Sequence, residues 1–319
     1  MHRMRDTILA QSFAEQICLP GLQRSQNEDG GWGFSAGCES RVEPTAWALI
    51  GLHEFSASRL SQSSMDRGLR YLIKAQLENG AWPAVSGDTR GCWVTSLACW
   101  ALILNKDYEE RLARGLRWLI QDRPRDSGFL WRIAHKLADR KKIGSQNPSL
   151  HGWSWTPQTA SWVEPTSYAL IVQGNRAAEA ESSDVLQRCQ IAEAMLYDRM
   201  CLGGGWNCGN PRVYGVEGQP QIGPTAWALV ALREHSQRPE NQLSLAWLES
   251  TLDKIETPES LCLTMISLGV YGRRHRALAE KIRQMTETVV VPWSVPAFAW
   301  GAIATSETPR WLEVCSVNR

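Results

Sequence analysis

The chain has 319 residues, of which 43% are hydrophobic, and a formal net charge of +1 at pH 7. This length supports a buried core in one large domain or in two small ones. The near-zero charge argues against the concentrated basic surface that phosphate binding needs, so we expect no nucleic acid as the main partner.

A seven-residue sequence motif recurs along the chain. Its copies are Glu43–Leu49 (EPTAWAL), Glu164–Leu170 (EPTSYAL) and Gly223–Leu229 (GPTAWAL), and a degenerate copy lies at Val94–Leu102. A loop rich in glycine and tryptophan precedes each copy, and the chain has 16 tryptophans against 5 phenylalanines. Such recurrence indicates one supersecondary unit that is built several times and stacked, with a repeated structural role for tryptophan.

Each unit is predicted to run from a charged outer helix, through the Gly/Trp loop, to an apolar inner helix. The clearest outer helix spans residues 67–76, where Leu69, Leu72 and Ile73 fall on one face. The pair Asn79-Gly80 then supplies residues that end a helix. Proline in the first turn starts the inner helix of three copies, at Pro44, Pro165 and Pro224.

The spacing of the units predicts the fold. The inner segments are apolar almost all round, which predicts burial on every side. The threonines at positions 45, 95, 166 and 225 lie 50, 71 and 59 residues apart, the length of a helical hairpin with a variable loop. Further helices are predicted at about 241–254, 258–270, 275–288 and 296–305.

This pattern predicts an all-α fold, an α/α toroid of about five to six helical hairpins with a central cavity. We expect residues 1–319 to form a single domain, with the repeats clearest in 7–232 and degenerate closing helices in 233–319. An open solenoid is the alternative, although inner helices this apolar do not suit an exposed concave surface.

Two motifs carry a resemblance to a known family. Residues 67–82 follow the pattern RGxxYLxxxQxxxGxW, which resembles the QW motif of squalene and oxidosqualene cyclases. Residues 26–32 form a second copy, and 114–119 begin a third that has Arg123 where glutamine is expected. The motif implies that the glutamine meets the tryptophan and backbone of the following loop. The Gly/Trp loop followed by Thr-x-x-Ala-Leu also resembles protein prenyltransferase β subunits, and both families imply the α/α toroid.

The resemblance directs attention to two glutamates. Squalene-hopene-type cyclases use an acid in a D-x-D-D motif just before the Thr-Ala of an inner helix, and this chain has no D-x-D-D. Glu43 and Glu164 stand in that register, so they are the candidate acids. A helix N-terminus, however, lowers the pKa of a carboxyl group, which is the wrong direction for a proton donor. The alternative is that both glutamates cap and charge-balance the inner helices.

A zinc site is the second candidate. Protein prenyltransferases bind zinc through Asp, Cys and His, and the nearest match here is Asp88 with Cys92. The spacing is longer than in that family, and His151 and His235 are candidate third ligands by position only. The alternative is a helix-entry loop with a small buried cysteine, and Asp88 stays a tentative catalytic residue. We expect no metal and no cofactor.

Aromatic residues form the third candidate set. In a cyclase, the resemblance implies that such side chains line the cavity and stabilise cations through their ring faces. The candidates for ligand binding are Trp47, Trp93, Trp100, Trp162, Tyr168, Trp227 and Trp300. The alternative for each of them is simple packing inside the ring, whereas as a set they suit a hydrophobic ligand.

Three functions therefore stay open. The first is a terpenoid-cyclase-like toroid that binds an isoprenoid or similar apolar ligand, with or without cyclase or transferase activity. The second is a non-catalytic helical scaffold that binds a protein or peptide, and the third is a zinc-dependent prenyltransferase β-like subunit that needs an α partner. Nine cysteines without a CxxC pair predict a cytoplasmic location. No apolar run is long enough to span a bilayer, and peripheral membrane contact stays open.

Overall fold

The computed structural model describes residues 13–55, 59–106, 108–131, 133, 146–179, 183–273, 278, 280–282, 284–285, 293–306 and 310–315. Across these residues the chain is mainly helical, which confirms the all-α prediction. Most of the helix expected at 275–288 lies outside the described residues. The other three late helices are present at the predicted places, within four residues at each end.

From α2 to α13, apolar helices alternate with more polar ones along the described part of the chain. The apolar helices are α3 (Val42–His53), α5 (Val94–Asn105), α9 (Val163–Glu179), α11 (Ile222–Ala231), α13 (Pro258–Val270) and α15 (Val295–Thr305). The helices between them are α2 (Leu19–Arg24), α4 (Arg59–Ala75), α6 (Glu109–Gln121), α10 (Ser183–Asp198) and α12 (Pro239–Ser250).

Short elements occupy some of the loops. The strand pairs are β1 (Trp153–Ser154) with β2 (Ser161–Trp162), and β3 (Arg212–Val213) with β4 (Val216–Glu217), both antiparallel. A π-helical turn covers Ala14–Cys18, and 3-10 turns cover Arg125–Ser127, Arg233–His235, Leu252–Lys254 and Arg310–Cys315.

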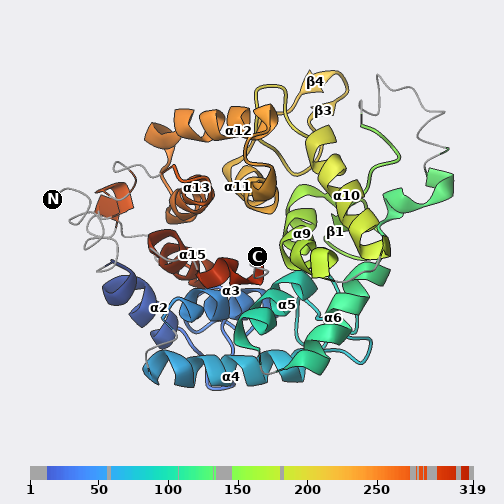
Figure 1. Cartoon of the computed structure of the whole chain (residues 1–319). Coiled ribbons are helices and arrows are strands. Elements are labelled where there is room, and N and C mark those ends of the chain that lie inside the picture. The colour runs from blue at the N-terminus through green and yellow to red at the C-terminus, as the bar shows by residue number, and fades with distance from the viewer. Residues whose placement is uncertain are drawn as a thin grey trace. The chain divides into compact units, whose positions relative to one another are not determined.

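The packing divides the chain into two compact units. The first comprises residues 1–115 and 255–316 as far as they are described, and the second comprises residues 116–254. In the first unit α3 packs between α5 and α15, α13 packs on α15, and α4 covers α3 (Figure 1). In the second unit α9 packs against α10 and α11, and α12 covers α11. The single domain expected for residues 1–319 stays a prediction.

The inner helices are buried, as their composition predicts. Every residue of α3 from Pro44 to Leu52 is buried, and so is every residue of α5 from Val94 to Leu102. Close helix contact requires glycine at one point, because a Cβ on Gly51 would lie 2.7 Å from the Cα of Ala299 in α15. Burial rather than capping therefore holds these helices in place.

A tryptophan–threonine pair connects each Gly/Trp loop to the inner helix that follows. The backbone N–H of Trp82 donates to Oγ1 of Thr95 at 3.0 Å, and that hydroxyl donates back to the Trp82 carbonyl at 3.4 Å. The indole N–H of Trp82 donates to the Leu72 carbonyl in outer helix α4 at 2.7 Å. The same three bonds recur at Trp32 with Thr45, Trp153 with Thr166, and Trp206 with Thr225.

The glutamine of the motif ties successive outer helices together. The Gln76 amide donates to the Gly80 carbonyl in the loop at 2.9 Å and to the Arg111 carbonyl in α6 at 2.8 Å. The Gln26 amide makes the matching pair of bonds in the first repeat, the second of them to α4. Gly80 has a φ of 91°, and a Cβ there would lie 2.7 Å from the Arg114 carbonyl oxygen. The glutamine thus binds the loop backbone, as expected, and the bond to the inner helix comes from threonine.

In the third repeat Arg123 stands at the position of this glutamine, and the bonds that bridge loop and helix come from Arg188. Arg188 in α10 donates to the Asp122 carbonyl at the end of α6 at 2.8 Å and to the Gly152 carbonyl at 3.4 Å. Its guanidinium also lies 4.2 Å from the Trp153 ring centroid. Burial lowers the pKa of Arg188 to about 10, which still leaves the group charged at neutral pH. The missing glutamine at position 123 is therefore compensated by a side chain from the next outer helix.

The threonine hydroxyl gives a direct test of this module. We expect Thr95→Val to lower the free energy of unfolding by about 1–3 kcal/mol, because it leaves the buried N–H of Trp82 without its acceptor. Urea unfolding followed by tryptophan fluorescence measures the change. Thr159→Val is the control, since the Thr159 hydroxyl is exposed and bonds only within its own turn. Equal losses in the two variants would contradict the role given to Thr95.

Candidate functional site

The two candidate glutamates occupy the same position in two inner helices. Glu43 is the second residue of α3 and Glu164 is the second residue of α9, and both are partly buried. Proline follows each of them in the first turn, where its missing N–H costs no helical hydrogen bond. The Trp–Thr pair of the same repeat then fixes the helix start relative to the loop. The fold therefore presents both carboxyl groups at the amino ends of buried helices.

Glu164 has the electrostatic property of a proton donor. Desolvation raises the pKa of its carboxyl group from the ordinary 4.5 to about 7, and no charged neighbour contributes to that shift. The sequence argument expected the helix N-terminus to lower this pKa, and that expectation is wrong. A helix dipole acts over about the first turn and is weak compared with the cost of burying a carboxylate without a cation beside it.

The surroundings of Glu164 come from two further segments of the second unit. The backbone N–H of Val163 donates to the Cys208 carbonyl at 3.0 Å. The Cys208 thiol donates to Oε1 of Gln221 at 3.4 Å, and both burial and Glu164 raise the pKa of this thiol. A Cβ added to Gly223 would lie 3.6 Å from Oε1 of Glu164. Gly223 stands where two other copies have glutamate, at positions 43 and 164, so its missing side chain leaves room beside the carboxyl group.

In the first unit Glu43 and Asp88 both lie close enough to Cys92 to affect its thiol electrostatically. Burial raises the pKa of the Cys92 thiol, and Asp88 and Glu43 add to this effect as neighbouring negative charges. The Asp88 carboxylate pairs with the Arg90 guanidinium at 3.2 Å, and the hydrogen bonds from Arg90 lower the pKa of Asp88. Asp88 is therefore ionised at neutral pH, and the same structure gives it no property of a proton donor.

A zinc site does not emerge from the described residues. Among them, no three His, Cys, Asp or Glu side chains lie close enough together to hold a metal ion. His235 contacts the Glu193 carboxylate at 3.2 Å. The pKa of His151 is lowered, first by burial and then by Arg188.

The candidate aromatic residues lie in two clusters and at two helix starts. In the first unit Trp47 packs edge-to-face on Trp100 and Trp300, with ring centroids 5.8 and 5.5 Å apart. In the second unit the rings of Tyr168 and Trp227 are 5.3 Å apart. These side chains are buried apart from the partly exposed Trp300. The remaining two, Trp93 and Trp162, directly precede α5 and α9 and are partly exposed.

Two residues near Glu164 were missed by the sequence analysis. Asp126 and Arg199 form a buried ion pair at 3.1 Å, and both bond Ser161, three residues before Glu164. Asp126 is 35 residues from Ser161, so no spacing in the sequence connects them. A signal for Ser161 was available, because Ser-x-Val-Glu-Pro-Thr occurs twice, at residues 40–45 and 161–166.

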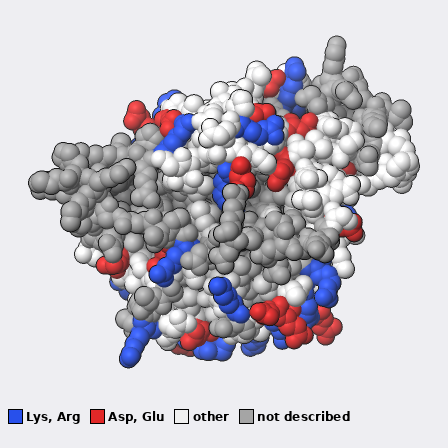
Figure 2. Space-filling view, viewed as in Figure 1, with Lys and Arg blue, Asp and Glu red and all other residues white. Residues whose placement is uncertain are grey.

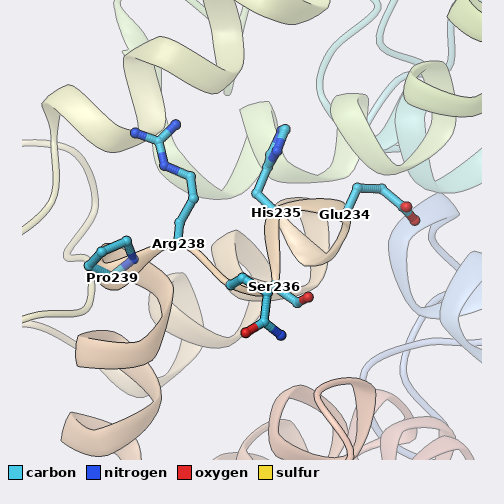
Figure 3. Close-up of a pocket in the computed structure, with 6 residues that line it drawn as sticks. Glu234, His235, Ser236, Arg238 and Pro239 are labelled. Atoms are coloured by element: carbon cyan, nitrogen blue, oxygen red, sulfur yellow. The ribbon is translucent and has the colours of Figure 1, made fainter.

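An open pocket lies at the opposite end of α11 from Gly223 (Figure 3). Its volume is about 360 Å³, and its lining residues are Glu234, His235, Ser236, Gln237, Arg238 and Pro239. The ten residues of α11 put about 15 Å between its two ends. His235, labelled in Figure 3, contacts the Glu193 carboxylate in α10. Arg238 lies over the Tyr197 ring, also in α10, and donates to the Glu240 carboxylate. Of the candidate residues named from the sequence, His235 is the one that lines this pocket.

The described residues on one face of the molecule show little separation of positive from negative charge (Figure 2). On the face drawn in Figure 2, positive and negative side chains are interspersed. Within the described part of the chain, no helix combines the length and the apolar character needed to cross a membrane. The expectations of a cytoplasmic location and of no nucleic-acid partner stay predictions.

Sequence comparisons connect the first repeats to one family. Residues 11–92 match the profile of the squalene-hopene cyclase C-terminal domain. A squalene–hopene cyclase from Bradyrhizobium diazoefficiens is 36% identical over 72 residues, which cover 19% of this chain and 11% of that cyclase. The segment that the profile matches, residues 11–92, includes Glu43 and Asp88 but not Glu164. These findings support the terpenoid cyclase superfamily, which the repeat motifs indicated.

Solved structures extend the likeness to the whole fold. A variant of the type II terpene cyclase MstE from Scytonema, in complex with geranylgeranyl dihydroxybenzoate (substrate), has a TM-score of 0.59 at 10% identity, covering 98% of this chain and 99% of that chain. Cellobiose 2-epimerase from Bacillus thermoamylovorans has a TM-score of 0.57 at 11% identity, covering 92% of each chain. The chain therefore has the α/α toroid fold. Because the fold occurs in proteins with unrelated substrates, it does not by itself define a function.

The raised pKa of Glu164 has a consequence for stability. Between about pH 4.5 and 7 the folded state keeps a proton that the unfolded state releases, so stability falls as the pH rises through this window. The change from this group is up to about 3 kcal/mol. We expect Glu164→Gln to lose this part of the pH dependence and to be the more stable protein above pH 7. Denaturant midpoints of both proteins at pH 5 and pH 8 measure the difference, and parallel changes in the two would contradict it.

Proposed function

We propose that this protein binds an isoprenoid or similarly apolar ligand and that Glu164 is its proton donor, in a terpene cyclase-like reaction. The observation that carries the proposal is the burial of the Glu164 carboxyl group at the start of α9, which raises its pKa to about 7. A general acid works best when its pKa lies near the working pH. The room beside Gly223 would give a reacting group access to that carboxyl group.

The likeness to terpenoid cyclases supports the choice of ligand. The Scytonema cyclase of similar fold is described with an isoprenoid-bearing substrate, and the sequence match names squalene-hopene cyclase. The aromatic side chains at Trp162 and Tyr168, two residues before and four after Glu164, suit an apolar or cationic group.

Product analysis tests the function. The protein is incubated with squalene and with a ladder of polyprenyl diphosphates, and products are identified by mass spectrometry. Glu43→Gln and Glu164→Gln are run beside it. A cyclised product that disappears only in Glu164→Gln supports the proposal. If every substrate is returned unchanged by the parent protein, cyclisation of these substrates is excluded.

A non-catalytic scaffold is the second candidate, and one observation favours it. Trp100 and Trp300 both pack on Trp47, and Trp311 packs on Trp100 with centroids 5.8 Å apart. The indole N–H of Trp100 also donates to the Trp311 carbonyl at 3.1 Å. Side chains that satisfy one another in this way act as core, as in a protein that only binds a protein or peptide. A protein bound stoichiometrically, together with absence of turnover, would favour this function.

A further inference from the structure

The start of α9 is fixed by a set of buried bonds that the sequence did not reveal. Asp126 accepts from the backbone N–H of Ser161 at 3.1 Å and from its hydroxyl at 2.8 Å. Arg199 donates to the Ser161 carbonyl at 2.7 Å and pairs with Asp126 at 3.1 Å. All three polar groups of Ser161 are therefore bonded to this ion pair. We call Ser161, Asp126 and Arg199 the α9 clamp.

The clamp is buried and lies close to Glu164 along the chain. The side chains of Arg199 and Asp126 are 5% and 1% exposed, although burying a charged pair costs substantial desolvation. From Ser161 the chain passes through Trp162 and Val163 directly to Glu164. Val163 is held in turn by its bond to the Cys208 carbonyl. The backbone of the segment that carries the carboxyl group is thus tied on both sides.

The first unit repeats the arrangement with different residues. The Ser40 hydroxyl donates to the Asp29 carboxylate at 2.7 Å, and the Ser40 carbonyl accepts from the Tyr71 hydroxyl at 2.8 Å. Ser40 precedes Glu43 by three residues, as Ser161 precedes Glu164. The other two copies of the motif lack both the serine and the glutamate. The copy at Thr95 has Arg90 and Trp93 at these positions, and the copy at Thr225 has Pro220 and Gly223.

The serine, its carboxylate partner and the glutamate therefore occur together or not at all. Structural need alone does not explain this coincidence, because the inner helices α5 and α11 form without the clamp. We propose that Asp126 and Arg199 are positioning residues that hold the start of α9 so that the Glu164 carboxyl group stays in its desolvated setting. This proposal rests on the assignment of Glu164 as the acid, made above.

The clamp acts by geometry. If the segment 161–164 is released, water reaches the carboxyl group and the cost of the charged form falls. The titratable group beside Glu164 in the described structure is the Cys208 thiol, whose raised pKa keeps it neutral. Loosening the clamp therefore changes the solvation of Glu164 and adds no compensating charge next to it.

A titration of Glu164 in mild clamp variants tests the proposal. Ser161→Ala removes the hydroxyl but leaves the ion pair, and Arg199→Lys keeps the charge but cannot reach both Ser161 and Asp126 in the same way. Thr159→Ala is the matched control, because it removes an exposed hydroxyl two residues from Ser161. The carboxyl carbon of Glu164 is followed by ¹³C NMR against pH, with its signal assigned by comparison with Glu164→Gln.

The expected result is a Glu164 pKa about one unit or more below that of the parent protein in both clamp variants, with no change in Thr159→Ala. Thermal unfolding shows whether each variant is folded at the titration temperature. An unchanged pKa of Glu164 in a folded Ser161→Ala or Arg199→Lys protein would overturn the proposal, and so would a parent pKa already near 4.5. The measurement needs no turnover, so an inactive parent protein with the expected shifts contradicts the proposed function and leaves the clamp in place.

Discussion

Glu164→Gln is expected to lower turnover of the proposed reaction by about 10²- to 10⁴-fold, the usual contribution of a general acid. Glutamine has nearly the same shape and keeps the amino end of α9 intact, so the loss reports on the proton and not on the fold. Single-turnover product formation at pH 6 measures the effect. Glu43→Gln is the matched variant, because Glu43 has the same place in α3.

The pH profile gives the same assignment an independent check. Only the protonated carboxyl group can donate, so kcat/KM is expected to be level below about pH 7 and to fall about tenfold per unit above it. A profile that falls instead toward low pH would show that the ionised group is required. If Glu43→Gln loses turnover and Glu164→Gln keeps it, the acid is Glu43.

The second large effect concerns stability. Arg199→Met is expected to lower the free energy of unfolding by about 3–5 kcal/mol, because it leaves the Asp126 carboxylate buried without its cation. Guanidinium chloride unfolding measures the loss. The double variant Asp126→Leu with Arg199→Met is expected to recover part of it, since no buried charge is left unpaired.

The exposed pair of Asp88 and Arg90 is the control for the buried one. The Arg90 side chain is 83% exposed, and solvent screens ion pairs of this kind, so Arg90→Met is expected to have little effect on unfolding. A loss in Arg199→Met no larger than that in Arg90→Met would show that burial gives the Asp126–Arg199 pair no special weight.

The sequence predicted the fold from local signals. Proline before Thr45, Thr166 and Thr225 marked the starts of three inner helices, and their apolar composition indicated burial. The glycine and tryptophan of each loop have short-range roles, with indole bonds that span ten residues in three of the four repeats. Signals of this kind depend only on neighbouring residues, so they can be seen in the sequence.

The site could be predicted only in part. Glu43 and Glu164 were found by position in the repeat, but the direction of the Glu164 pKa shift depends on burial that the tertiary fold produces. Asp126 and Arg199 come from segments 35 and 38 residues away from Ser161, and no motif connects them. The role of Arg188 was hidden for the same reason, because it lies in the helix after the loop that it binds.

The Trp–Thr pair has a consequence for how this protein can change over evolutionary time. Thirteen residues separate tryptophan from threonine in three repeats, and nineteen separate them in the fourth, where the β3–β4 hairpin is inserted. The bond from the Trp206 N–H to Thr225 is nevertheless 2.8 Å long, as short as its counterparts. Each loop is therefore fastened at both ends, and insertions between the fastened points can accumulate without shifting the helices. New surface features can arise there while the buried architecture is inherited unchanged.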